Sequence, residues 1–213
     1  MRITVLGGTG YAGSHVVAEA VKRGHEVTSY SRNAPDTPVA GVTYRTASVL
    51  DDGVLVEAVQ RTDAVVETLS PRGELAGKLE GVVARLIELT MAADVRLGVL
   101  GGASSLRVSA GGPRLIDVQP PSAEIADEVN TGIALLEALQ AAPEKLDWFY
   151  VSPAASFGAW VPGEAKGHYR LSDDVLLVDG NGDSNISGAD LAKAIVDEIE
   201  QPVHHRRRFH VAY

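Results

Sequence analysis

The first 32 residues constrain the fold more than any other part of the chain. An apolar run from Ile3 to Leu6 leads directly into glycines at positions 7, 10 and 13. A helical pattern follows, then Gly24 and a second strand-like run from Glu26 to Ser31. A strand, a glycine turn, a helix and a strand in this order form the unit that binds dinucleotides in α/β proteins.

Glycine suits such a turn because a tight bend off a strand needs backbone angles that a β-carbon disfavours. Without side chains the backbone can also come close to a pyrophosphate, and the free N–H groups at the start of the helix then face that anion. The spacing here is G-x-x-G-x-x-G and differs from the simplest fingerprint, G-x-G-x-x-G. A glycine-rich turn that binds nothing is the alternative.

The end of the second strand favours NADP(H) over NAD(H). NAD sites usually carry an acid about 20 positions after the glycines, whereas this strand ends Tyr30-Ser31-Arg32-Asn33. The planar guanidinium of Arg32 suits a 2′-phosphate, and Ser31 would add a hydroxyl donor. A solvated charge at a strand end is the alternative for Arg32, and Asp36 lies too far along the loop to replace the missing acid.

Length and composition are those of one globular α/β protein. The 213 residues are 45% apolar and 22% charged, which allows a sizeable core in one domain, residues 1–213. The chain has no cysteine, which excludes disulfides and thiolate catalysis, and its six histidines show no metal-ligand spacing, so no metal is expected. The formal net charge of −9 argues against a nucleic-acid partner.

The sequence also bears on location. No apolar run reaches the roughly 18 residues of a membrane span, so no membrane partner is expected. The first strand begins within two residues of Met1, which leaves no room for a signal peptide. A cytoplasmic protein, monomeric or homodimeric, is therefore the expectation.

Strands and helices alternate through the first two thirds of the chain, which predicts a Rossmann-type, doubly wound parallel sheet in three layers. The remaining strands are expected at 42–47, 64–66, 95–100 and 146–151, and the helices at about 52–61, 75–93 and 123–140, the last opened by Ser122. Small or polar residues follow the strands: 7–9, 68–70, 101–104 and 152–154. Because ligands bind beyond the carboxyl ends of such strands, these turns, with Gly102 and Pro153 among them, predict one cleft.

The last third breaks this alternation. Residues 168–171 and 175–178 are expected to form a hairpin, Ser187 to begin a helix, and residues 209–213 to form a final strand. This portion, about 155–213, is expected to fold over the cleft as a small substrate-side extension.

The sequence argues against the tyrosine mechanism of ordinary short-chain dehydrogenases, because no tyrosine has a lysine four residues on. Hydride transfer to a flavin needs no strong general acid, so this absence favours a conjugated acceptor. The candidate catalytic residues are Ser104, which follows the fifth strand, and His168 with its neighbour Tyr169. A capping role for Ser104 and a surface position for His168 are the alternatives.

The stretches GGTGYAG, GHEVTSYSR and GGASSL resemble atypical, NAD(P)-binding short-chain dehydrogenases. Residues 147–213 are similar to the NADH-flavin reductase branch of that superfamily. The resemblance implies a Rossmann fold, a nicotinamide dinucleotide and a flavin (FMN, FAD or riboflavin) or quinone as acceptor. It also implies pyrophosphate contacts from Gly7, Thr9, Gly10, Tyr11, Ala12 and Gly13.

The same resemblance implies further cofactor contacts. Arg32 would meet the adenosine ribose or its phosphate, and Thr68, Leu69 and Ser70 would line the nicotinamide ribose. Ser48 and Val49 stand where relatives carry an aspartate that binds adenine.

The function expected from the sequence is therefore an NAD(P)H-dependent oxidoreductase that passes hydride to a small conjugated acceptor. A non-catalytic redox sensor that binds NADP(H) fits the missing Tyr-x-x-x-Lys pair equally well. A nucleotide-sugar epimerase or dehydratase is disfavoured, because such enzymes use that tyrosine and usually add a larger C-terminal domain.

Overall fold

A computed structural model describes residues 1–213. Its strands are β1 (Arg2–Leu6), β2 (Glu26–Ser31), β3 (Val42–Thr46), β4 (Ala64–Glu67), β5 (Arg96–Leu100), β6 (Trp148–Ser152), β7 (Arg170–Ser172) and β8 (Arg207–Ala212). Its helices are α1 (Tyr11–Lys22), α2 (Asp52–Val59), a 3-10 turn η1 (Gly73–Leu75), α3 (Leu79–Ala93), α4 (Leu115–Val118), α5 (Ala126–Ala141) and α6 (Gly188–Glu200).

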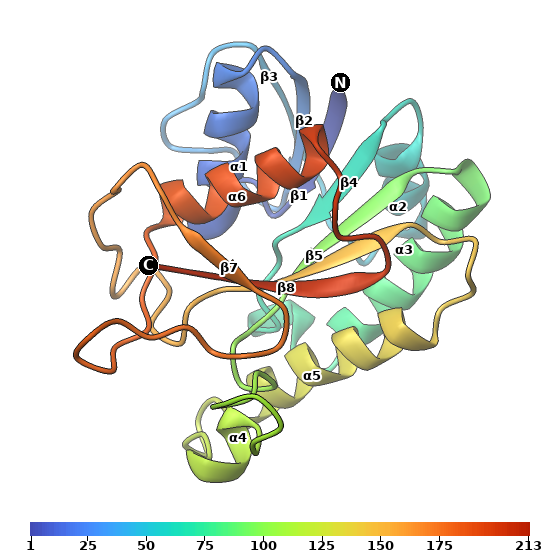
Figure 1. The fold of residues 1–213 in the computed structure, drawn as a ribbon. Coiled ribbons are helices and arrows are strands. Elements are labelled where there is room, and N and C mark those ends of the chain that lie inside the picture. The colour runs from blue at the N-terminus through green and yellow to red at the C-terminus, as the bar shows by residue number, and fades with distance from the viewer.

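All eight strands belong to one sheet in the order β3-β2-β1-β4-β5-β6-β8-β7. Every pair is parallel except β7 with β8. Helices α1 and α6 pack together on one face, and α2, α3 and α5 cover the other (Figure 1). The strand order reverses between β1 and β4, which is where a doubly wound sheet binds its ligand. The predicted fold class is confirmed.

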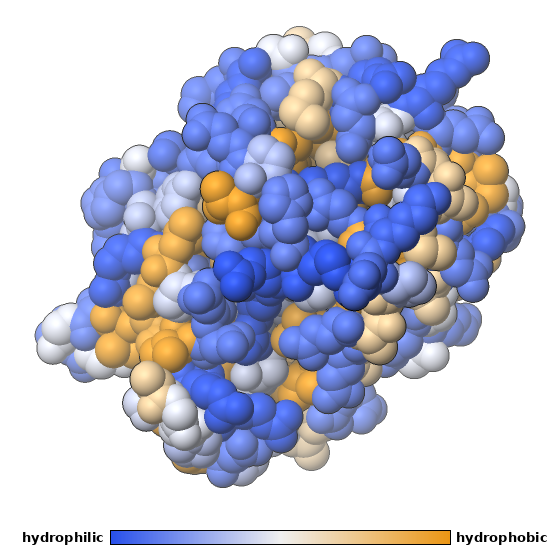
Figure 2. Space-filling model, turned by 45° about the vertical axis from the view of Figure 1, so that its right-hand side comes forward, coloured by the Kyte–Doolittle hydropathy of each residue, from blue (hydrophilic) through white to orange (hydrophobic).

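Two apolar cores, one on each face, hold the layers together. The core under α1 and α6 includes Val5, Val17 and Ile195, and the core under α2, α3 and α5 includes Leu86 and Leu139. The inner strands β4 and β6 are buried on both faces, which explains their continuous apolar runs. Hydrophilic residues cover most of the face in Figure 2, and apolar residues reach it in separate patches.

Side-chain caps mark the starts of two helices, α2 and α6. The Asp51 side chain accepts a hydrogen bond from the N–H of Gly53 at the start of α2, and Ser187 accepts one from the N–H of Asp190 at the start of α6. Two predicted starts were early. Helix α3 begins at Leu79 because η1 and the left-handed Gly77 (φ +66°) precede it, and α5 begins at Ala126 without a side-chain cap from Ser122.

The predicted hairpin between residues 168–171 and 175–178 was wrong. Strand β7 pairs antiparallel with β8 instead, so that Leu171 lies opposite Val211. The following residues bond to the loop after β5: the Arg107 N–H donates to the Asp174 carbonyl at 2.7 Å, and the Leu176 N–H donates to Arg107 at 2.8 Å. The edge of β8 has unpaired backbone groups, and residues 170–172 pair with this distant strand and not with residues 175–178.

None of the helices combines the length and the apolar character needed to cross a bilayer.

Candidate dinucleotide-binding site

The turn after β1 is shaped by its glycines. Gly7 has a left-handed backbone (φ +87°), its N–H donates to the Tyr30 carbonyl at 2.8 Å, and its own carbonyl accepts from the Gly10 N–H at 2.9 Å. A β-carbon on Gly13 would lie 2.2 Å from the Gly7 carbonyl oxygen. Helix α1 is therefore pressed against the turn at a distance that only glycine allows.

The start of α1 has backbone donors to offer. Gly10 is the N-cap residue, and no side chain caps the helix. The first N–H groups of a helix have no partner within it, and the helix dipole favours negative charge there. Ser31, at the end of β2, supports this arrangement because its Oγ accepts from the Thr9 N–H at 3.1 Å. These features fit a bound pyrophosphate.

The turn opens onto a cavity of about 720 Å³ at the carboxyl ends of the strands. Most of the residues predicted from the sequence line it: Gly7, Thr9, Gly10, Tyr11, Ala12, Ser31, Arg32, Ser48, Val49, Thr68, Leu69, Ser70, Gly102, Ser104 and Pro153. Gly13 does not reach the cavity and lies beneath the turn, packed against Gly7 and Thr68. The volume is within the usual range of small-molecule sites.

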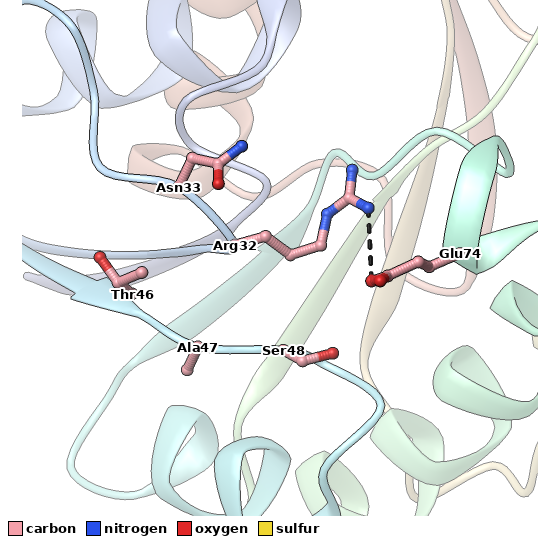
Figure 3. Close-up of a pocket in the computed structure, with 6 residues that line it drawn as sticks. All are labelled: Arg32, Asn33, Thr46, Ala47, Ser48 and Glu74. Atoms are coloured by element: carbon pink, nitrogen blue, oxygen red, sulfur yellow. Dashed lines mark hydrogen bonds and ion pairs between the residues drawn. The ribbon is translucent and has the colours of Figure 1, made fainter.

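The end of the cavity near β2 and β3 combines an apolar slot with a polar hollow. Tyr30, Val49 and Leu75 are among the apolar residues that line the slot. Beside it a hollow of about 350 Å³ is lined by Arg32, Asn33, Thr46, Ala47, Ser48 and Glu74. Figure 3 shows the Arg32 side chain extending to Glu74, with 3.4 Å between Nη1 and Oε2. An adenine with its ribose fits this combination.

The turn after β4 is held from below. The Thr68 hydroxyl donates to the Leu6 carbonyl at 2.8 Å, which ties β4 to β1 under the glycine turn. The Leu69 N–H donates to Oε1 of Glu67 at 2.5 Å. Glu67 is fully buried, its Oε2 has no hydrogen-bond partner, and burial raises the pKa of its carboxyl to about 8. This carboxyl is therefore protonated at neutral pH.

Tyr150 fixes the floor of the cavity between β5, β6 and α5. Its hydroxyl donates to the Gly132 carbonyl at 2.8 Å and accepts from the Gly102 N–H at 3.2 Å. A β-carbon on Gly101 would lie 1.6 Å from that hydroxyl oxygen. Burial raises the pKa of Tyr150 to about 12, so the phenol stays protonated and serves as a structural donor.

The opposite end of the cavity is aromatic and more open. Phe157 and Trp160 line it from the segment after β6, and Trp160 is 69% exposed. Arg72 donates to Glu128 on α5 at 2.6 Å, and its guanidinium lies 6.0 Å from the Trp160 ring. Ser104 also lines the cavity. A planar molecule with a polar or charged group suits this lining.

Two candidate catalytic residues do not reach the cavity, which corrects the sequence-based expectation. Tyr169 donates to Asp197 at 2.5 Å on the side of α6, and burial together with this bond raises the pKa of the phenol. Nδ1 of His168 lies 3.1 Å from the Lys166 carbonyl oxygen, and its ring faces Tyr213. The pairing of β7 with β8 carries both residues away from the cavity.

Sequence reasoning missed two acidic residues: Glu74, which lines the cavity, and Glu67, which is buried beneath the turn after β4. Glu67 is the last residue of β4, and its position in the sequence does not indicate that its carboxyl is buried. Glu74 meets Arg32 across 42 residues of sequence, and no local pattern signals such a contact.

The fold and the cavity together define a Rossmann-type, dinucleotide-binding protein. The model of the NAD(P)H-binding family matches residues 7–202, and the chain belongs to this family. It is 36% identical to the uncharacterized protein YwnB of Bacillus subtilis over 214 residues, which cover 99% of this chain and 98% of YwnB. The resemblance to NAD(P)-binding, atypical short-chain dehydrogenases is confirmed.

Two solved structures share the whole fold. One is a proposed NADH-flavin reductase from Streptococcus pneumoniae, 28% identical with a TM-score of 0.86, covering 100% of this chain and 99% of that one. The other is a proposed epimerase from Bacteroides thetaiotaomicron, 32% identical with a TM-score of 0.87, covering 100% and 96%. These two solved structures share the fold, yet they are described with different activities.

Proposed function

We propose that this NAD(P)H-dependent oxidoreductase uses NADP(H) as its preferred cofactor and passes hydride to a flavin, a quinone or a similar conjugated acceptor. One observation carries the proposal: the uncapped start of α1 and an aromatic wall border the same cavity. The first suits a pyrophosphate and the second a planar ring. A single cavity can therefore place a dinucleotide and an acceptor side by side.

The cofactor contacts follow from the lining. The glycine turn from Gly7 to Ala12 would hold the pyrophosphate through backbone N–H groups, and Arg32 would meet the 2′-phosphate. Val49 and Ser48 would border the adenine, and Thr68, Leu69 and Ser70 the nicotinamide ribose. The bound nicotinamide supplies the hydride.

The acceptor would occupy the end near Phe157 and Trp160. Stacking on an aromatic wall orients a planar acceptor and excludes water from its face, which is the main task in hydride transfer to a conjugated ring. Ser104, which also lines the cavity, would donate a hydrogen bond to the acceptor or to the nicotinamide amide. The description of the Streptococcus pneumoniae relative as a proposed NADH-flavin reductase supports a flavin as acceptor.

The test mixes the purified protein with NADPH and FMN, riboflavin or a soluble quinone, and follows loss of absorbance at the reduced nicotinamide band. We expect turnover with at least one of these acceptors, and a lower rate with NADH. Binding of NADPH without turnover of any acceptor would overturn the proposal and favour the redox sensor.

A further inference from the structure

Arg32 is already paired before any cofactor binds. Its Nη1 lies 3.4 Å from Oε2 of Glu74, across the hollow that adjoins the adenosine end of the cavity (Figure 3). The two residues come from different elements, since Arg32 follows β2 and Glu74 lies in η1. A carboxylate therefore occupies the guanidinium that would receive the 2′-phosphate.

This ion pair is exchangeable. The Arg32 side chain is 52% exposed and the Glu74 side chain 64%, and exposed pairs of this kind contribute little to stability. A phosphate can pair with a guanidinium through two parallel hydrogen bonds, which is stronger than the single long contact here. A 2′-phosphate can therefore displace Glu74, but it must do so against a competing negative charge.

We propose that Glu74 sets the balance between NADP(H) and NAD(H), by competing with the 2′-phosphate for Arg32 and by accepting a hydrogen bond from the ribose hydroxyls of NAD(H). The inference rests on the proposed function, in which Arg32 faces the adenosine ribose. It assigns to Glu74 the part that an acid at the end of β2 plays in NAD-binding proteins.

The charges in the hollow give the direction of the effect. A 2′-phosphate carries about −1.5 to −2 charges at neutral pH, so it is repelled by the Glu74 carboxylate while it is attracted by Arg32. A ribose hydroxyl has no charge and gains an acceptor in the same carboxylate. Glu74 thus weakens NADP(H) binding and strengthens NAD(H) binding. It therefore reduces the preference for NADP(H) over NAD(H) that Arg32 alone would produce.

The experiment measures the dissociation constants of NADP⁺ and NAD⁺ by calorimetry for the wild type and for Glu74→Gln. The fragments 2′,5′-ADP and 5′-AMP, which lack the nicotinamide, are titrated in parallel, so that the readout is independent of turnover. We expect Glu74→Gln to bind NADP⁺ and 2′,5′-ADP about fivefold more tightly, and NAD⁺ and 5′-AMP less tightly. The change for NADP⁺ and 2′,5′-ADP should shrink at high salt, because salt screens the charge repulsion between exposed groups.

The matched control is Glu88→Gln. Glu88 is also exposed and also pairs with an arginine, Arg85, at 2.8 Å, but it lies on α3 and does not line the cavity. We expect this variant to leave the ratio of the two dissociation constants unchanged. Glu74→Ser repeats the test with a different side chain, in case the glutamine is poorly tolerated in η1.

The outcomes separate this inference from the proposed function. If both cofactors bind the wild type and neither Glu74 variant changes the ratio, the role of Glu74 is refuted and the proposed function stands. An equal change in Glu88→Gln would also refute it, since a general loss of negative charge would then explain the effect. If the wild type binds neither cofactor, the proposed function fails and the inference falls with it.

Discussion

The glycine turn after β1 and the segment from Pro153 to Ser187 border the same side of the molecule but are held in different ways. The turn is held by backbone contacts that leave no space for a β-carbon at Gly13. The segment is held by side chains from distant elements: the Tyr213 hydroxyl donates to Asp190 at 2.5 Å, and Asp190 accepts from the N–H groups of Lys166 and Gly167. Local sequence can encode the first kind of contact, whereas only the fold can bring together the second.

Tyr11 connects the two regions. It belongs to the glycine motif, yet its hydroxyl donates to the Pro162 carbonyl at 2.9 Å and accepts from the Gly188 N–H at 3.1 Å. Its ring also lies 5.4 Å from that of Phe157. Tyr11 is therefore a side chain through which the glycine turn and the segment are in direct contact.

The largest effect is expected in the turn, from Gly13→Val. The new side chain would overlap the Gly7 carbonyl and push α1 away from β1, so that the backbone donors no longer converge. We expect NADPH affinity to fall by at least about 100-fold, as measured by calorimetry.

Gly81→Ala is the control for this change, because a β-carbon at that position on α3 meets no atom within 4 Å. It should bind NADPH like the wild type. Unchanged binding by a folded Gly13→Val protein would show that the turn does not hold the dinucleotide.

A second effect concerns the buried carboxyl beside the turn. Because burial raises the pKa of Glu67 to about 8 from an ordinary 4.5, the folded state holds a proton that the unfolded state releases. The contribution of Glu67 to the free energy of unfolding therefore decreases as pH rises from about 5 to about 8. Glu67→Gln removes that loss.

Urea unfolding at pH 5.5 and pH 8.5 measures this decrease in the free energy of unfolding. The free energy of unfolding of Glu67→Gln minus that of the wild type should be larger at pH 8.5 than at pH 5.5, by on the order of 3 kcal/mol. The exposed Glu88→Gln variant should show no such difference, and equal pH dependence in the wild type and Glu67→Gln would contradict the protonated state.

In the substrate-side segment, Tyr213→Phe should cost about 1–3 kcal/mol of stability at neutral pH, because it leaves the buried Asp190 carboxylate with fewer donors. Burial acts to raise the pKa of Asp190, but hydrogen bonds from Tyr213, Lys166, Ser187 and Gly167 bring it below its ordinary value. The group thus stabilises the fold above its unfolded pKa, and the deficit of the variant should shrink as pH falls below about 4.

Thermal unfolding as a function of pH checks this prediction. We also expect the variant to keep NADPH affinity more nearly intact than acceptor turnover. A larger loss of NADPH affinity than of turnover would show that the two regions are not separable.

The smallest effect is expected at the exposed aromatic wall. Trp160→Ala removes the stacking surface, and we expect the KM for the acceptor to rise about fivefold while NADPH affinity is kept. His168→Ala serves as the control, since that ring lies against Tyr213 and away from the cavity. Steady-state kinetics compares the two, and a matching loss in His168→Ala would restore that histidine as a candidate.

The sequence predicted much of the cofactor end because the relevant signals are short in range. The run from Ile3 to Gly13 encodes a strand, a turn and a helix start within a dozen residues, and the structure forms all three. The alternation of apolar and polar segments likewise predicted the parallel sheet. Each strand carries its own apolar pattern, and strands that alternate with helices are joined by crossovers, which makes neighbouring strands parallel.

Tertiary structure decided the rest. The sequence by itself determined that the chain has a dinucleotide turn and an arginine at the end of β2. Only the fold decided that Glu74 would face that arginine, that β7 would pair with β8, and that Tyr169 would turn toward Asp197. The physical reason is that these contacts join residues 28 to 42 positions apart, whose approach depends on the packing of the whole sheet and its helices.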